Sequence, residues 1–328
     1  IHRLLEFDPR TALFGRNEEN PLTASTIIVD EVSMVDIPLI QNLLAATPRG
    51  CRLVLVGDVD QLPSVGPGNV LRDLIDSRKI RVVRLAQIYR QARESRIVVN
   101  AHRVNAGEMP LLGEDAPDFR FVEIEGGEEA LAWIKNFLSG EIRERHGLDP
   151  VRDVQVIAPM HKGIAGVSSL NKELQALLNP RGEEIRRDDK ILRVGDKVIQ
   201  IRNNYELDVF NGDVGRIAEI SPEAEELEVL FGGRRVRYAF ARLDELTLAY
   251  AVSVHKSQGS EYRAVIAPLL GEHFPMLQRN LLYTAITRGR ELVVLVGSKR
   301  TVGIAVRNNR IRHRYSFLAH RLRSGDAA

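Results

Sequence analysis

Short runs of β-branched and other apolar residues alternate with longer amphipathic segments along most of the chain. Five runs predict strands: Thr26–Val29, Leu53–Val56, Val154–Ile157, Val265–Ala267 and Leu292–Val296. Four longer segments predict helices: Ile37–Ala46, Glu128–Leu138, Ser168–Leu178 and Pro275–Thr287. Continuous apolar runs are typical of strands buried on both faces of a parallel sheet. The repeated order of strand and then helix therefore predicts an α/β fold.

The stretch from about Arg193 to Leu246 has a different pattern, with short segments in which apolar and polar residues alternate. These segments are Lys197–Ile201, Val214–Ile220, Glu226–Phe231 and Arg235–Phe240. The dipeptides Asn211-Gly212 and Gly232-Gly233 are strong hairpin signals. We therefore expect a small β-barrel-like module inserted into the second α/β domain.

Composition narrows the class of protein without identifying it. A chain of 328 residues can form two or more domains, and its 44% hydrophobic content is ordinary for a globular protein. No apolar run approaches the roughly 20 residues that cross a bilayer, so a cytoplasmic protein without a membrane partner is expected. The single cysteine, Cys51, excludes an internal disulfide and a cysteine-rich zinc site.

Charge is distributed unevenly, although the formal net charge is only +2. No Asp or Glu occurs from Leu292 to Gly325, a stretch that contains Lys299, Arg300, Arg307, Arg310, Arg312, Arg314, Arg321 and Arg323. This pattern predicts either a solvated basic face on a terminal helix or a direct contact with nucleic-acid phosphates.

Polar clusters follow the first two predicted strands, where open parallel sheets bind ligands. Asp30 and Glu31 follow the first strand, and Gly57, Asp58 and Gln61 follow the second. In a nucleotide hydrolase such an Asp can hold Mg²⁺ while the Glu polarises the attacking water. A glutamine amide can donate to a γ-phosphate oxygen and accept from a water. Taken alone, Asp-Glu after a strand also fits the start of a helix.

These clusters, continued by Gly66-Pro67-Gly68-Asn69-Val70-Leu71, resemble motifs II and III of superfamily 1 helicases. Three later segments resemble motif IV (Tyr89-Arg90-Gln91-Ala92), motif V (Val254 to Glu261) and motif VI (Tyr283 to Arg290). Within that superfamily, the segments most similar to the RecD-like branch, the exodeoxyribonuclease V alpha subunit family, are Ile1 to Leu5, Ala158 to Gly163 and Arg202 to Tyr205.

The resemblance implies two RecA-like parallel-sheet domains, the first incomplete, with an inserted SH3-like β-barrel. The expected divisions are 1–98 for the first domain, with a hairpin insertion at about 7–25, then 99–192 and 247–328 for the second, with the β-module at 193–246. The polar segment Phe7–Ser25 would be the wedge that splits a duplex. An ordinary surface loop fits it as well.

The resemblance also assigns nucleotide roles residue by residue. Asp30 would bind Mg²⁺, Glu31 would activate water and Gln61 would report on the γ-phosphate of ATP. Arg90 and Arg288 would reach that phosphate from the far side of a cleft between the domains. The remaining nucleotide contacts would be Gly57, Asp58, Gly259 and Glu261. Alternatively, Arg288 is a helix C-terminal arginine that balances the helix dipole and packs over Tyr283.

Contacts with single-stranded DNA are expected at a second set of positions. These are His2, Ser64, Val65, His255, Ser257, Gln258, Asn203 and Asn204. Neutral hydrogen bonds to sugar and phosphate suit a motor that grips any sequence. A lone histidine is usually structural, and a turn of the β-module accounts for Asn203, Asn204 and Tyr205 equally well.

The pattern departs from the superfamily at the P-loop, which needs glycine followed by lysine. No glycine in this chain is followed by lysine, and residue 1 is Ile. We therefore expect a fragment of a longer ATP-dependent helicase, its P-loop upstream of Ile1, that hydrolyses ATP barely or not at all by itself.

The function expected of the intact protein is 5′ to 3′ translocation on single-stranded DNA and unwinding at duplex junctions, in repair or recombination. The direction rests on the resemblance alone. Nuclease or other recombination subunits are possible partners. Two alternatives stay open: the helicase part of a conjugative relaxase, and an ATP-independent module that binds DNA or docks onto another subunit.

Overall fold

The computed structural model describes residues 1–85, 94–113, 116–187, 190–310 and 314–325. The chain divides into two compact units. One comprises Ile1–Tyr89 and Arg310–Ala328, and the other comprises Arg90–Asn309. The C-terminal segment therefore belongs to the same unit as the N-terminal residues, although the second unit lies between them in the sequence.

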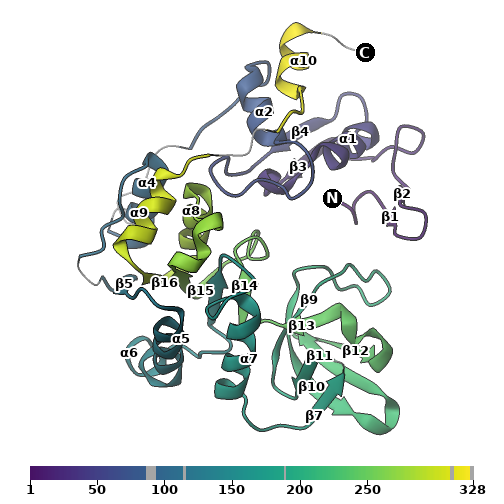
Figure 1. The fold of residues 1–328 in the computed structure, drawn as a ribbon. Helices are drawn as coiled ribbons and strands as arrows, with labels where there is room; N and C mark the ends of the chain where they lie inside the picture. The colour runs from purple at the N-terminus through teal and green to yellow at the C-terminus, as the bar shows by residue number, and fades with distance from the viewer. Residues whose placement is uncertain (86–93, 114–115, 188–189, 311–313, 326–328) are drawn as a thin grey trace. The chain divides into compact units, whose positions relative to one another are not determined.

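The second unit is built on a parallel sheet of five strands in the order β14-β6-β15-β16-β5 (Figure 1). The strands are β5 (Phe119–Glu123), β6 (Val154–Ala158), β14 (Ala251–Ser253), β15 (Tyr262–Leu269) and β16 (Gly289–Gly297). This sheet confirms the α/β class that the alternating pattern predicts.

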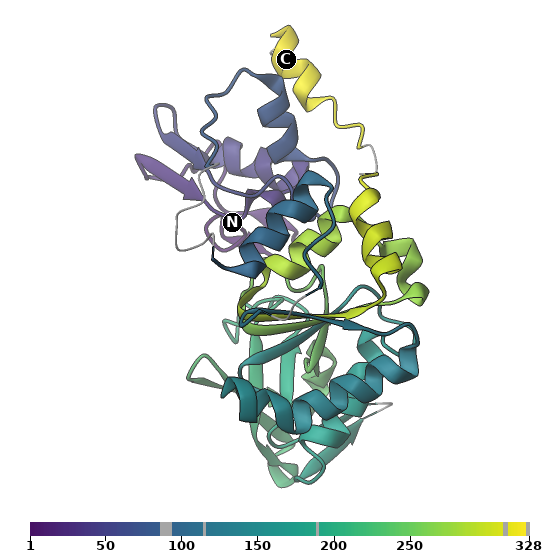
Figure 2. The same cartoon turned by 90° about the vertical axis from the view of Figure 1, so that its left-hand side faces the viewer.

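Helices cover both faces of this sheet, as the edge-on view in Figure 2 shows. One face carries α4 (Arg96–Ala106), α8 (Arg279–Thr287) and α9 (Lys299–Arg307), and the other carries α5 (Gly127–Asn136), α6 (Ile142–His146) and α7 (Val167–Leu178). A π-helical turn, Phe137–Glu141, joins α5 to α6. Because both faces are covered, β6 is buried along its whole length, which confirms the prediction for that strand.

The β-module is a five-stranded antiparallel sheet in the order β12-β11-β10-β9-β13. Its strands are β9 (Lys197–Gln200), β10 (Val214–Ser221), β11 (Glu226–Phe231), β12 (Arg234–Ala239) and β13 (Leu246–Leu248). A separate hairpin, β7 (Glu184–Arg187) with β8 (Lys190–Arg193), precedes it. The module has its own apolar core around the fully buried Tyr238, whose hydroxyl donates to Gln200 Oε1 at 3.0 Å.

The two predicted turns of the module have different outcomes. Gly232 and Gly233 both have positive φ, 53° and 92°, and join paired strands as the two-residue hairpin that was expected. Asn211-Gly212 is not such a hairpin, because β9 ends at Gln200 and β10 begins at Val214. The glycine, with φ 103°, instead closes a longer connection in which its amide donates to Gln200 O at 2.9 Å.

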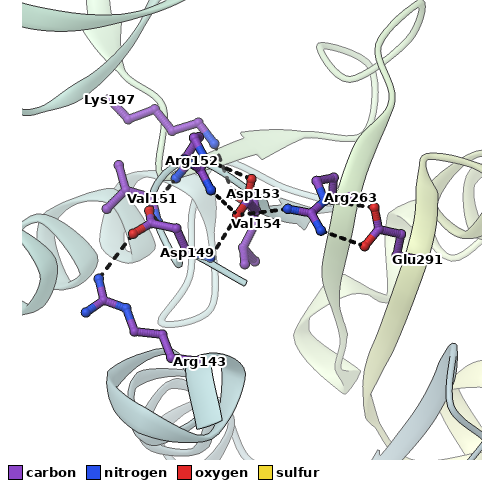
Figure 3. A network of polar contacts seen from close by, with 9 residues as sticks. All are labelled: Arg143, Asp149, Val151, Arg152, Asp153, Val154, Lys197, Arg263 and Glu291. Carbon is purple, nitrogen blue, oxygen red and sulfur yellow. Dashed lines mark hydrogen bonds and ion pairs between the residues drawn. The ribbon is translucent and has the colours of Figure 1, made fainter. Parts of the chain in front are cut away.

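A polar network fastens the module to the parallel sheet (Figure 3). Lys197, at the start of β9, is 7% exposed and donates from Nζ to the carbonyl oxygen of Val154 in β6 at 2.9 Å. Burial lowers the pKa of Lys197 to about 8. Beside it Asp153 contacts the guanidinium groups of Arg152 and Arg263 at 3.0 and 3.3 Å. The hydrogen bond from Arg152 is the main cause that lowers the pKa of Asp153 to about 2.

The first unit contains a parallel pair, β3 (Thr26–Val29) and β4 (Arg52–Leu55). Around it lie a 3-10 turn, Val32–Met34, and the helices α1 (Ile37–Ala46) and α2 (Val70–Ser77). Strand β3 alternates between exposed and buried residues, with Ile28 69% exposed. The prediction of burial on both faces is therefore wrong for β3. Only its Ile27 and Val29 face the apolar core of this unit.

Two further elements of the fold bear on the predictions. Near the N-terminus β1 (Phe7–Asp8) pairs with β2 (Leu13–Phe14) as a short antiparallel hairpin.

The helix predicted over Pro275–Thr287 is wrong in its first turn. A 3-10 helix, Gly271–Met276, contains Pro275, and the backbone becomes extended at Gln278 before α8 begins. Gln278, with φ −127° and ψ 153°, is the N-cap of α8, so the α-helix begins at Arg279 rather than at Pro275.

Candidate functional site

The two polar clusters of the first unit lie at one edge of its sheet. Val29 pairs with Leu55 in parallel register, and the amide of Val56 donates to Val29 O at 2.8 Å. The amide of Val32 in turn donates to Val56 O at 3.0 Å. Asp30 and Gly57 therefore leave the sheet at neighbouring positions of its carboxyl edge, where open α/β sheets bind ligands.

The two carboxylates of the first cluster differ in conformation. Asp30 is exposed, and its Oδ1 accepts from the amide of Glu31 at 2.8 Å. Glu31 is half-buried and has φ 53° and ψ 40°, a left-handed conformation that residues with a side chain rarely adopt. Such strain persists only where the surroundings fix it, and it is frequent at functional sites. The turn thus places an exposed carboxylate, Asp30, directly before a half-buried one, Glu31.

The second cluster forms a tight turn around Asp58. A Cβ on Gly57 would lie 3.0 Å from the amide nitrogen of Val32, so any larger residue would crowd this close approach. The carboxylate of Asp58 accepts from the amide of Asp60 at 3.0 Å and from Gln61 Nε2 at 3.3 Å. Gln61 Oε1 is buried and has no hydrogen-bond partner among the described residues. That oxygen is therefore placed to accept a hydrogen bond from a water or a ligand.

Ser64 and Val65, both predicted to contact DNA, are neighbours in the loop from Ser64 to Gly68 but differ in exposure. Ser64 is 3% exposed, and its hydroxyl lies within hydrogen-bond distance of the carbonyl oxygens of Gly66 and Gly68. Val65, in contrast, is 86% exposed. The side chain of Ser64 therefore holds the loop, while that of Val65 is exposed to solvent, and its contact with DNA stays a prediction.

His2 packs against the short hairpin near the N-terminus. Its ring centroid lies 5.3 Å from that of Phe7 and 5.7 Å from that of Phe14. Burial lowers the pKa of His2, which favours the neutral imidazole near pH 7. The ring therefore has a structural role in the hairpin, and a contact with DNA stays a prediction.

In the second unit the segment that resembles motif V follows β14. Ser257 is fully buried, and its hydroxyl donates to Val254 O at 2.8 Å, while Gln258 is 8% exposed. His255 is half-buried, and burial followed by the nearby charge of His161 lowers its pKa. Because β6 and β14 are parallel neighbours, these two histidines follow adjacent strands at one edge of the sheet.

Arg288 links the segments that resemble motifs V and VI. It caps the C-terminus of α8, is 4% exposed and donates from Nη1 to Ser260 O at 3.0 Å. Its Nε is buried without a hydrogen-bond partner among the described residues. Gly259 has φ 73°, and the exposed carboxylate of Glu261 lies 3.8 Å from Arg290 Nε. Arg90 lies outside the described residues.

The asparagines of the β-module are part of a turn. Asn204 is 8% exposed, donates from Nδ2 to Glu245 Oε2 at 2.9 Å and accepts from the amide of Leu207 at 3.0 Å. Asn203 is exposed, and its Oδ1 accepts from the amide of Asn211 at 3.0 Å. These bonds support the structural alternative for Asn204, whose amide is already engaged at both ends.

A cationic cavity between α7, β14 and the β-module is the feature that sequence reasoning missed. It has a volume of about 550 Å³, and the residues that line it include four that can carry positive charge and none that is acidic. The four are His161, Lys172, Lys190 and Lys256. Burial and the charge of Lys190 both lower the pKa of Lys256. In the sequence, the one trace of this cavity is the helical spacing of polar residues along α7, and such spacing by itself predicts no ligand.

The described part of the chain contains neither a metal-binding cluster nor a membrane-spanning helix. No group of three or more His, Cys, Asp or Glu residues there could hold a metal ion. Within the same residues no helix has the length and apolar character needed to cross a membrane.

Three family models match successive parts of the chain. An AAA domain matches residues 1–67, the SH3 domain of ATP-dependent RecD-like DNA helicases matches 170–231, and the UvrD-like helicase C-terminal domain matches 248–296. The SH3 match covers most of α7, the β7–β8 hairpin and the module as far as β11.

Comparisons over the whole chain also find relatives of the RecD type. The ATP-dependent RecD2 DNA helicase of Deinococcus radiodurans is 38% identical over 324 residues, which cover 99% of this chain and 43% of that protein. The RecBCD enzyme subunit RecD of Mycobacterium tuberculosis is 31% identical over 326 residues, covering 95% of this chain and 56% of that protein. This chain thus spans about half the length of these relatives.

Solved structures share the fold at low identity. A Pif1 helicase from Bacteroides in complex with ADP-AlF3 and ssDNA is 18% identical, with a TM-score of 0.53 over 90% of this chain and 77% of that one. A second structure, Bacteroides Pif1 bound to ssDNA, gives a TM-score of 0.51 at 18% identity, over 84% and 72% of the two chains.

Proposed function

Because the chain belongs to the RecD-like family of superfamily 1 helicases, we propose that it is a motor part of an ATP-driven 5′ to 3′ DNA helicase that acts in repair or recombination. The observation that carries the proposal is the shared carboxyl edge of β3 and β4. That edge holds Asp30 and Glu31 beside Gly57 and the turn to Gln61. The domain divisions and the site residues named from the sequence stay predictions.

The nucleotide side of the proposal begins at Asp30, whose exposed carboxylate fits Mg²⁺, a cation that prefers oxygen ligands and is usually held by one or two carboxylates plus phosphates. When bound with ATP, Mg²⁺ would neutralise charge on the phosphate oxygens. Glu31 would take a proton from the attacking water. The buried Oε1 of Gln61 would accept from that water while its Nε2 moves from Asp58 to a phosphate oxygen.

Positive charge for the transition state would come from Arg288. Its Nη1 is bonded to a backbone carbonyl, and its Nε has no partner among the described residues. A buried guanidinium with unused donor capacity gains strongly from an anionic ligand. Arg288 would therefore exchange part of its contact with Ser260 for a phosphate oxygen.

The DNA side of the proposal rests on neutral and cationic groups outside the nucleotide cluster. The exposed Val65 and the half-buried, neutral His255 suit contacts with bases and sugars. The cavity lined by Lys172, Lys190 and Lys256 suits a phosphate backbone, because no acidic residue opposes those charges. Partner subunits and a cytoplasmic location stay predictions.

The test is ATP hydrolysis by the protein at its natural length, measured with and without oligo-dT. Glu31→Gln should lower the DNA-stimulated kcat by about 100-fold or more, as loss of a group acting on the transition state does. Glu223→Gln, an exposed carboxylate on the β-module, is the matched control and should leave kcat unchanged.

Binding of labelled oligo-dT with and without a nonhydrolysable ATP analogue separates the proposal from its alternatives. A motor should bind DNA with an affinity that changes when nucleotide binds, because each state grips differently. Equal affinity in both conditions would contradict the motor and favour a passive DNA-binding or docking module.

A further inference from the structure

The C-terminal segment after α9 returns to the first unit and packs there. Its helix α10 (Leu318–Ser324) lies beside α2 in both views of the fold (Figures 1 and 2). Ser316 donates its hydroxyl hydrogen to the carboxylate of Asp73, and Arg323 Nη2 donates to Asp76 O at 2.7 Å. These contacts hold the segment on α2. They also bring Arg314, one of the cations in the acid-free stretch of the sequence, next to the Ser64–Gly68 loop.

Arg314 inserts one end of its guanidinium into that loop. Its Nη1 donates to Gly66 O at 2.7 Å and to Gly68 O at 2.8 Å, and lies 3.2 Å from Ser64 Oγ. Among the described residues, the other group within hydrogen-bond distance of these oxygens is the hydroxyl of Ser64. Ser64 has one hydroxyl hydrogen, yet both carbonyl oxygens lie within its reach. Without the arginine, the two carbonyls would compete for a single donor.

The opposite side of the loop is fixed by the start of α1. The amide of Ile37 donates to Pro67 O at 3.0 Å. A Cβ on Gly66 would lie 2.0 Å from Asp36 Oδ2, and Gly68 has φ 90°. Three successive carbonyls, at positions 66, 67 and 68, therefore accept hydrogen bonds from two different elements. The loop is held between α1 and Arg314, and Val65 at its tip stays exposed.

We propose that Arg314 is a positioning residue for the Ser64–Gly68 loop: through the carbonyls of Gly66 and Gly68 it sets the backbone that presents Val65 to a DNA strand. This inference rests on the proposed function for the ligand of Val65, but the positioning itself does not. Gln61, which the proposed function places near the nucleotide, lies three residues before Ser64 in the sequence.

The competing role for this cation is a direct phosphate contact, one of the two interpretations of the basic stretch. The two roles differ in their dependence on salt. Removing a phosphate contact lowers the slope of log affinity against log salt concentration by about 1, whereas a change in loop conformation leaves that slope unaltered. The geometry favours positioning, because Nη1 is already committed to the loop oxygens.

The first experiment compares the wild-type chain with the variants Arg314→Met and Arg314→Lys, all at full length. Amide hydrogen exchange over residues 62–69 should become faster in Arg314→Met and recover in part in Arg314→Lys, which keeps a cationic donor. Arg321→Met, an exposed position of α10, is the matched control and should leave this exchange unchanged. Unaltered exchange over residues 62–69 in Arg314→Met would overturn the proposal, whether or not the chain binds DNA.

The second experiment measures the Kd for oligo-dT at several salt concentrations. Arg314→Met should raise Kd by about 3- to 30-fold, the usual range for coupling through a second residue, at an unchanged salt slope. Val65→Ala should weaken binding in the wild-type chain and have little further effect in Arg314→Met. A salt slope lowered by about 1 would contradict positioning and assign Arg314 to phosphate. Absence of any binding by the wild-type chain would count against the proposed function, and hydrogen exchange would then decide the role of Arg314.

Discussion

Lys197 Nζ donates to the backbone carbonyl of Val154 across 2.9 Å, and this bond joins the first strand of the β-module to a central strand of the parallel sheet. The ammonium group is almost fully buried, and its pKa is lowered to about 8 because burial disfavours the charged form. The junction between module and sheet is therefore sensitive to the protonation of one lysine.

Lys197 should make the stability of the second unit rise with pH between about 8 and 10.5. Its folded pKa lies below its unfolded value of about 10.4, so the unfolded chain binds more protons in this window and folding gains as pH increases. The variant Lys197→Met should lose this rise in the free energy of unfolding between pH 8 and 10.5. Urea unfolding at pH 8, 9 and 10 checks it, with Lys162→Met, at an exposed lysine, as control. Parallel stability curves for wild type and Lys197→Met would contradict the assignment.

Asp153 should also make stability rise with pH, but in the acidic range, because here the charged form is the one that the fold stabilises. Its folded pKa of about 2 lies below the unfolded value, so the carboxylate stabilises the fold above pH 4 and this contribution is lost as pH falls toward 2. We expect Asp153→Asn to lower the free energy of unfolding at pH 7 by about 2 kcal/mol. The difference between variant and wild type should shrink steadily from pH 4 downward. A difference independent of pH would mean that packing, not charge, is responsible.

Gly66→Ala should destabilise the first unit. The new methyl group would meet the Asp36 carboxylate, which caps α1 by accepting from the amide of Leu39 at 2.9 Å. Displacing that cap and the loop should cost about 1 to 3 kcal/mol. Thermal unfolding monitors the loss. Gly271→Ala, where an added Cβ meets nothing within 4 Å, should leave the unfolding temperature nearly unchanged.

Lys256→Met should weaken binding of oligo-dT and reduce its salt dependence. This lysine lines the cationic cavity, where Lys190 is the neighbouring charge. Loss of one phosphate contact lowers the slope of log affinity against log salt by about 1. Fluorescence anisotropy at several salt concentrations gives the slope. Lys79→Met, at an exposed lysine of the first unit, is the control. An unchanged slope for Lys256→Met would exclude the cavity from the DNA path.

Much of the fold could be predicted because burial and local geometry leave direct traces in the sequence. The run Thr26–Val29 is a strand, α1 has the predicted bounds Ile37–Ala46, and the polar clusters that begin at Asp30 and Gly57 share one sheet edge. The error at Pro275 arose because apolar spacing continues through a proline that starts no α-helix.

Contacts between distant segments could not be predicted in the same way. Arg314 reaches the loop at Ser64 across about 250 positions of sequence, and no local pattern records that pairing. The cationic cavity is assembled from α7, β8 and the turn after β14, each unremarkable alone. Sequence periodicity describes which face of an element is buried, and it does not describe which element covers that face.

The most direct test of the account is a crystal structure of the protein at its natural length with ADP, aluminium fluoride and oligo-dT. We expect Glu31, Gln61 and Arg288 all to lie within hydrogen-bond distance of the fluoride group or its attacking water, with Arg288 turned at least partly from Ser260 O. A nucleotide that contacts Glu31 and Gln61 while Arg288 stays on Ser260 O, facing another surface, would contradict it.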